Sequence, residues 1–97
     1  MRFDFVDLRL FLHVVETGSF TQGAQHSALS LQAASERIRK LENGFGTQLF
    51  TRHRTGVELT CAGQRFLEHA RLLLQQSQSL EQDMNHFRQT PQHTIHL

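Results

Sequence analysis

Several residue types are scarce in this chain of 97 residues, and each scarcity narrows the classes of protein to consider. The sequence has no tryptophan or tyrosine, one proline and one cysteine. A single cysteine cannot form a disulfide within the chain, which fits a reducing cytoplasm. No apolar run approaches the roughly 20 residues of a membrane span, so we expect no membrane partner and a cytoplasmic location. A chain of this length has room for one domain with a small core.

The net charge of the chain is also small. Ten Lys and Arg are balanced by nine Asp and Glu, which leaves a net charge of +1. The distribution is uneven, however. Residues 36–54 carry five basic side chains against two carboxylates, whereas both flanking segments are slightly acidic. Such a local excess is typical of a solvated helix face, but it also suits a surface that contacts nucleic-acid phosphates. Which of these two interpretations applies depends on where the segment lies in the fold.

What the sequence does contain is helical periodicity. The first helix has apolar residues at steps of three and four: Phe5, Leu8, Phe11, Leu12 and Val15. We expect it to end at Gly18 and a short second helix to begin at Ser19 or Thr21. Ser30 is a suitable N-cap for a third helix. The apolar face of that third helix is Ala34, Ile38, Leu41 and Phe45.

A short turn between the second and third helices, with one helix ahead of them, is the arrangement of a helix-turn-helix. The outer face of the third helix is polar over residues 35–40. The major groove of DNA admits such a helix, and polar side chains on it can contact base edges. The spacing alone fits equally well a three-helix bundle whose third helix is merely basic.

After the third helix the periodicity changes. Residues 49–52 and 56–59 predict two short strands joined by a turn. A hairpin here would carry Arg52 and Arg54 beside the third helix, within reach of phosphates or of an adjacent minor groove. This is the layout of a winged helix-turn-helix, and it gives the basic segment a geometric role.

The last helix is the clearest element. We expect it to be capped by Thr60 and to run from Cys61 to about Arg88, which is about 40 Å. Its apolar seam follows strict four- and three-residue steps: Phe66, Ala70, Leu73, Ser77, Leu80, Met84 and Phe87. A heptad seam of this length exceeds what so small a domain can cover, so we expect it to form a homodimer interface. The alternative is a helix packed wholly inside one protomer.

These segments predict a mainly α fold with three parts. Residues 1–60 form a winged helix-turn-helix of three helices and a two-stranded wing, and residues 61–88 form a dimerisation linker helix. Residues 89–97 contain the proline and then an alternating stretch that resembles the start of a strand. We therefore expect them to be a hinge and the beginning of a second, C-terminal domain.

Four blocks of sequence resemble the LysR-type transcriptional regulators, in order and spacing, over about residues 4–88. They are the segment 11–21, Ser35-x-x-Ile38-x-x-Leu41-Glu42, Gly46-x-x-Leu49-Phe50-x-Arg52 and Leu59-Thr60-x-Ala62-Gly63. The resemblance implies transcription regulation through sequence-specific binding of double-stranded DNA, as a dimer on an imperfect inverted repeat. It implies no cofactor within this segment, a C-terminal domain that binds a small-molecule effector, and a tetrameric or dimeric full-length protein.

The resemblance also implies which residues contact DNA. The side chains expected at base edges are Leu31, Gln32, Ser35, Glu36 and Arg39. Those expected at phosphates or on the wing are Ser19, Thr21, Arg37, Arg52 and Arg54. The family commonly has Gln-Pro where this chain has Leu31-Gln32, and Arg where it has Glu36. Leucine can contact a thymine methyl and glutamate can accept from a cytosine amino group, so the base preference is not carried over.

Other classes of function remain as alternatives. One is a helical dimeric module for protein interactions that does not bind DNA, and another is a winged-helix regulator of the molybdate-responsive type. An enzyme is not expected, because the sequence contains no nucleophile elbow, no glycine-rich phosphate loop and no metal-ligand spacing.

Two smaller features have plain interpretations. Cys61 stands at a helix start that could lower its thiol pKa and permit a redox role, but a small residue at a helix start is the simpler account. His86, His93 and His96 straddle the expected hinge without fixed spacing, so we interpret them as solvated side chains rather than a metal site.

Overall fold

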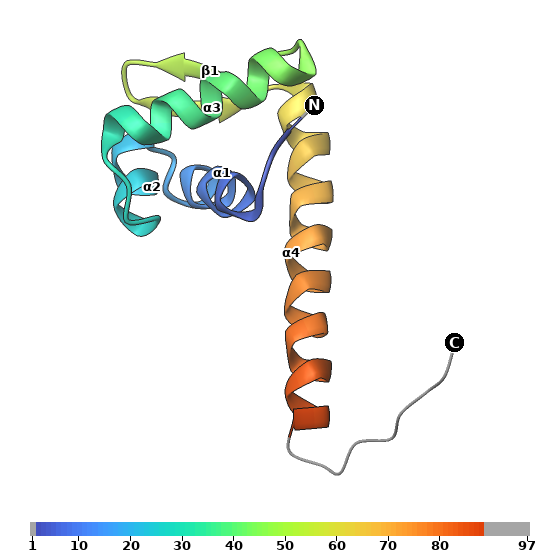
Figure 1. Ribbon diagram of the computed structural model, residues 1–97. Coiled ribbons are helices and arrows are strands. Elements are labelled where there is room, and N and C mark those ends of the chain that lie inside the picture. The colour runs from blue at the N-terminus through green and yellow to red at the C-terminus, as the bar shows by residue number, and fades with distance from the viewer. Residues whose placement is uncertain (1, 89–97) are drawn as a thin grey trace.

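The computed structural model describes residues 2–88, which form four helices and one antiparallel hairpin (Figure 1). The elements are α1 (Phe5–Thr17), α2 (Phe20–His26), α3 (Leu31–Phe45), β1 (Phe50–His53), β2 (Gly56–Leu59) and α4 (Cys61–Arg88). The predicted mainly helical fold with a two-stranded wing is confirmed. The hinge and strand expected over residues 89–97, together with His93 and His96, lie outside the described residues.

Local capping sets most of the helix boundaries as the sequence predicts. Ser19 and Ser30 cap α2 and α3 by accepting hydrogen bonds from the backbone N–H groups three residues on. Gly18 and Gly46 end α1 and α3 in the left-handed conformation, with φ of 69° and 70°. The Thr60 hydroxyl accepts from the backbone N–H of Gly63 at the start of α4.

The strand boundaries differ slightly from the prediction, because β1 begins at Phe50 and not at residue 49. The two strands pair antiparallel, with Phe50 opposite Leu59. The backbone N–H groups of Leu49 and Phe50 donate to the carboxylate of Glu42 at 2.7 and 3.1 Å. This carboxylate therefore fixes the point at which the chain leaves α3 and enters the wing.

One core joins the three helices of the domain to the first strand of the wing. Its buried members are Leu10, Phe11, Val14, Ala24, Ala34, Ile38, Leu41, Leu49 and Phe50. The Phe11 ring stacks at tilted angles on Phe50 and on Phe66 of α4, with ring centroids 4.9 and 4.6 Å apart. These contacts attach α4 to the domain at its first turns.

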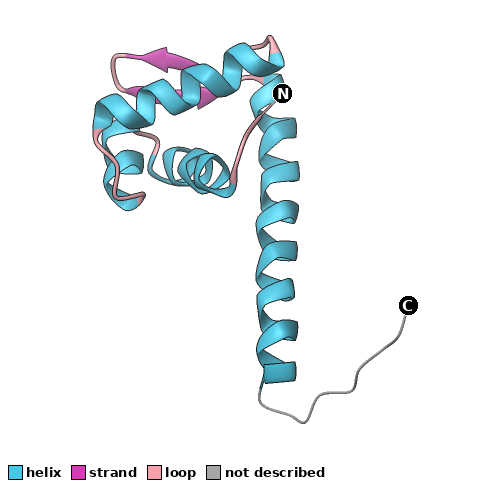
Figure 2. Ribbon diagram, in the orientation of Figure 1, coloured by secondary structure: helices cyan, strands magenta, loops and turns pink. Residues whose placement is uncertain are grey.

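Helix α4 leaves the domain and extends away from it (Figure 2). Of its described residues only Gly63 and Ala70 are buried, so none after Ala70 lies in the protomer's core. The expected seam is thereby divided: its first two positions have partners within the protomer, whereas the pairing of two copies through the seam stays a prediction. Phe66 packs on the domain core and Ala70 is 1% exposed within one protomer, because α4 begins against α1.

Two findings apply to residues 2–88. No helix in this range combines the length and the apolar character needed to cross a bilayer. Within the same range, no three His, Cys, Asp or Glu side chains gather into a group able to hold a metal ion.

Candidate nucleic-acid interface

Helix α3 turns one face to the core and the other to the outside. Ala34, Ile38 and Leu41 are buried, as their spacing predicts. On the outer face Leu31, Gln32, Glu36 and Arg39 are exposed and Ser35 is half-buried. All five side chains expected at base edges therefore lie on the accessible surface of one helix. Ser30 caps the N-terminus of α3, where the first of these side chains, Leu31, stands.

A shallow concavity connects this face to the wing. It is lined by Gln32, Ser35, Glu36, Arg39, Glu42 and Arg52. Four of the expected base-contacting side chains are thus brought together with a basic residue of β1. Within this set the guanidinium of Arg39 lies 3.6 Å from the carboxylate of Glu36, and both side chains are more than half exposed. An exposed pair of this kind is weak, so either group can exchange its partner for a base edge or a phosphate.

Arg52 is held in place by an aromatic ring. Its guanidinium carbon lies 4.2 Å from the centroid of the Phe20 ring, which stands at the start of α2. Such cation–π contacts are worth about 0.5–1 kcal/mol at exposed sites. The Phe20 ring in turn packs edge-on against Phe50, with centroids 5.4 Å apart. Through the Phe20 ring, the domain core therefore orients the side chain of Arg52 on the wing.

The wing is docked on the turn between α1 and α2. The backbone N–H of Val57 donates to the carbonyl of Gly18 at 3.2 Å. A second concavity at this junction is lined by Gly18, Ser19, Phe20, Val57 and the hairpin turn with Arg52 and Arg54. Three of the expected phosphate contacts, Ser19, Arg52 and Arg54, thus share one surface. Thr21 is exposed on the first turn of α2 next to it.

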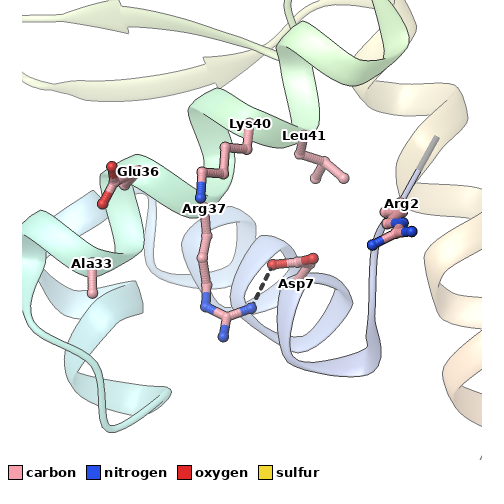
Figure 3. A pocket seen from close by; sticks show the side chains of 7 residues that line it. All are labelled: Arg2, Asp7, Ala33, Glu36, Arg37, Lys40 and Leu41. Carbon is pink, nitrogen blue, oxygen red and sulfur yellow. Dashed lines mark hydrogen bonds and ion pairs between the residues drawn. The ribbon is translucent and has the colours of Figure 1, made fainter.

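Arg37, the fifth expected phosphate contact, has different surroundings (Figure 3). Its side chain leaves α3 toward the first turn of α1, where Nη1 lies 2.9 Å from Oδ1 of Asp7 and 3.4 Å from Oδ1 of Asp4. The hydrogen bond to Asp7 raises the pKa of Arg37 above its usual value. The backbone hydrogen bond from Asp7, assisted by Arg37, lowers the pKa of Asp4. The structure therefore does not bring Arg37 together with the wing arginines.

Sequence reasoning did not foresee the supporting residues of this surface. Glu42 and Phe20 stand inside the blocks that resemble the LysR-type regulators, so a signal was present, but their roles depend on contacts with distant segments. Asp4 and Asp7 form a reciprocal capping box at the start of α1, each side chain accepting from the other's backbone N–H. The local sign of this capping box in the sequence is the spacing of Asp4 and Asp7, two acidic residues three positions apart at the start of an apolar helix.

Three helices followed by a two-stranded wing, with an exposed polar face on the third helix, define a winged helix-turn-helix domain. The chain matches the family described as "Bacterial regulatory helix-turn-helix protein, lysR family" over residues 5–64. It belongs to this family. The expected resemblance is confirmed, and the molybdate-responsive alternative is set aside.

Similar proteins include the HTH-type transcriptional regulator HdfR of Shigella boydii serotype 18 and that of Escherichia coli O139:H28. Each is 40% identical to the chain over 79 residues, which are 81% of this chain and 28% of the relative. The chain thus spans only about 28% of the length of these relatives. They are transcriptional regulators rather than enzymes, as expected for this sequence.

Solved structures with the same fold include two isolated DNA-binding domains. The BenM domain in complex with catB site 1 DNA has a TM-score of 0.88 and 28% identity, covering 93% of this chain and all of that one. The CbnR domain in complex with DNA has a TM-score of 0.83 and 29% identity, covering 90% of this chain and 100% of the CbnR domain. DarR of Vibrio fischeri in complex with DNA has a TM-score of 0.84 and 30% identity, covering 92% of this chain and 30% of DarR.

Proposed function

We propose that this chain is the part of a transcriptional regulator that binds double-stranded DNA sequence-specifically. The observation that carries the proposal is the shared concavity, in which five polar side chains of α3, four of them expected base contacts, and Arg52 of the wing face the same space. A helix inserted into the major groove beside a basic wing needs this arrangement, because base edges and the flanking phosphates must be contacted together. The similar BenM and CbnR domains were solved on DNA.

In this proposal the two groups of side chains have different tasks. Ser19, Thr21, Arg52 and Arg54 contact phosphates and position the domain, with the wing arginines beside or in the adjacent minor groove. The exposed face of α3 contacts the bases. Leu31 packs on a thymine methyl group and Glu36 accepts from a cytosine amino group, which departs from the base preference common in the family.

The proposal extends to the assembly. Two copies pair through the exposed part of α4 and present two α3 helices to successive major grooves of an imperfect inverted repeat. In the whole regulator, located in the cytoplasm, a small-molecule effector binds a C-terminal domain and changes how the two half-sites are held. A tetramer of the whole protein would join two such pairs.

Selection of bound duplexes from a random DNA pool tests the proposal directly. With the 97-residue chain at about 150 mM salt, we expect enrichment of a motif with two-fold symmetry. A single enriched half-site would support base recognition but contradict a stable dimer of this chain. No enrichment by a chain shown to be folded would overturn the proposal and favour a protein-interaction module.

Two alanine substitutions separate positioning from base recognition. Arg52→Ala should weaken binding to all sequences alike and make the salt dependence of log K shallower by about 0.9 per bound protomer, because one phosphate contact is lost. Gln32→Ala should change the preferred bases at one position of each half-site, by about 1–3 kcal/mol. Binding isotherms on selected and random duplexes over a salt series measure both. Uniform losses from both variants would show that this division of tasks is wrong.

A further inference from the structure

One residue of α3 and two at the start of α1 form a closed polar network beside the base-contacting face. The carboxylates of Asp4 and Asp7 accept from each other's backbone N–H groups at 2.9 and 3.0 Å. Nη1 of Arg37 donates to Asp7 Oδ1 at 2.9 Å and lies 3.4–3.5 Å from the two oxygens of Asp4. The guanidinium of Arg37 on α3 thus ties together both members of the α1 capping box.

This network neutralises the charge of Arg37 inside the protomer. The Asp7 side chain is only 14% exposed and that of Arg37 36% exposed, so their contact is partly shielded from solvent. Ion pairs that are partly removed from water are screened less by salt than those on an open surface. A cation already held by two carboxylates is poorly suited to release counterions from a phosphate backbone.

The location of the network gives it a second consequence. Arg37 follows Glu36 directly, and Figure 3 shows their side chains pointing to different sides of α3. Burial of Ala34 and Ile38 turns the apolar face of α3 to the core and thereby sets the rotation of the helix coarsely. Hydrogen bonds to fixed carboxylates are directional. The contacts of Arg37 with Asp7 and Asp4 therefore refine the orientation of α3, and with it the direction in which Ser35 and Glu36 leave the helix.

We propose that Arg37 is a positioning residue that fixes α3 against the capping box of α1, and that it does not contact phosphate. The inference rests on the proposed DNA binding and replaces the phosphate role expected for this residue from the family resemblance. Asp4 and Asp7, although acidic, thereby become part of the apparatus that recognises DNA sequence.

The substitutions Asp7→Asn and Arg37→Gln distinguish two roles for Arg37, the positioning of α3 and the contact with a phosphate. Asparagine keeps an oxygen for the capping box and removes the charge that holds Arg37. If Arg37 positions α3, both variants lower the preference for the selected duplex over a random duplex, by about two- to fivefold for a pair of this exposure. The double variant should be no worse than either single one, because both remove the same contact. Arg37→Lys should restore part of the preference, because an ammonium can still pair with Asp7.

The salt dependence on the random duplex gives the second measurement, with Arg52→Ala as the comparison. Arg37→Gln should leave the slope of log K against log salt concentration unchanged from that of the wild-type chain. A slope shallower by about 0.9 per bound protomer, or an Asp7→Asn variant whose preference for the selected duplex stays equal or rises, would overturn the positioning role. In either case the wild-type chain still binds, so the proposed function would stand. A folded wild-type chain with no affinity for either duplex would overturn both. Circular dichroism confirms that each variant is folded.

Discussion

Gly23→Ala should destabilise the domain by about 1–3 kcal/mol, the usual cost of overpacking a core. A Cβ at this position of α2 would lie 2.5 Å from Cγ2 of Val14 and 2.9 Å from its backbone N and Cα. A flexible side-chain end could move away, but the backbone of α1 cannot yield without separating the two helices. Chemical unfolding monitored by circular dichroism measures the change in the free energy of unfolding.

Gly44→Ala is the matched control, because Gly44 also stands inside a helix but is exposed near the end of α3. There the same substitution should be neutral or stabilising by up to about 1 kcal/mol, since alanine is the better helix former. Equal stabilisation by both substitutions would show that α1 and α2 are not in close contact at Gly23.

Leu80→Asp should convert the proposed dimer into monomers. Leu80 is 58% exposed on the part of α4 that the protomer does not cover, and it lies on the heptad seam. Two-fold symmetry places the substitution on both sides of the interface. Loss of two buried leucines costs about 3–6 kcal/mol, and so raises the dissociation constant of the dimer at least about a hundredfold. Sedimentation equilibrium of the 97-residue chain measures this constant.

Leu72→Asp is the control for this experiment, because Leu72 has a similar exposure of 63% but lies off the seam. It should leave the association nearly unchanged. Since both side chains are exposed within the protomer, neither substitution should alter the circular dichroism of the monomer. Dissociation by Leu72→Asp with no effect of Leu80→Asp would mean that a different face of α4 forms the interface.

The helices and strands of this protein could be predicted from its sequence, because their signals are local. Helical spacing of apolar residues and the capping residues Ser19, Ser30 and Gly46 act within a few positions of the chain. The exposed side of α3 followed from the same spacing, since the residues that do not face the core must face outward. The sequence alone therefore places the side chains proposed at base edges on one surface.

Contacts between distant segments account for the features that local spacing cannot encode. Gly23, an unfavourable residue by helix propensity, is required by the close approach of Val14 from α1. The family resemblance implies a phosphate contact for Arg37, but its carboxylate partners stand 30 and 33 positions earlier in the chain, and only the fold brings them together. Phe66 and Ala70 follow the same heptad as Leu80, yet they pack inside the protomer because α4 begins against α1. Periodicity shows that a face is apolar, but only the packing of distant segments determines what covers it.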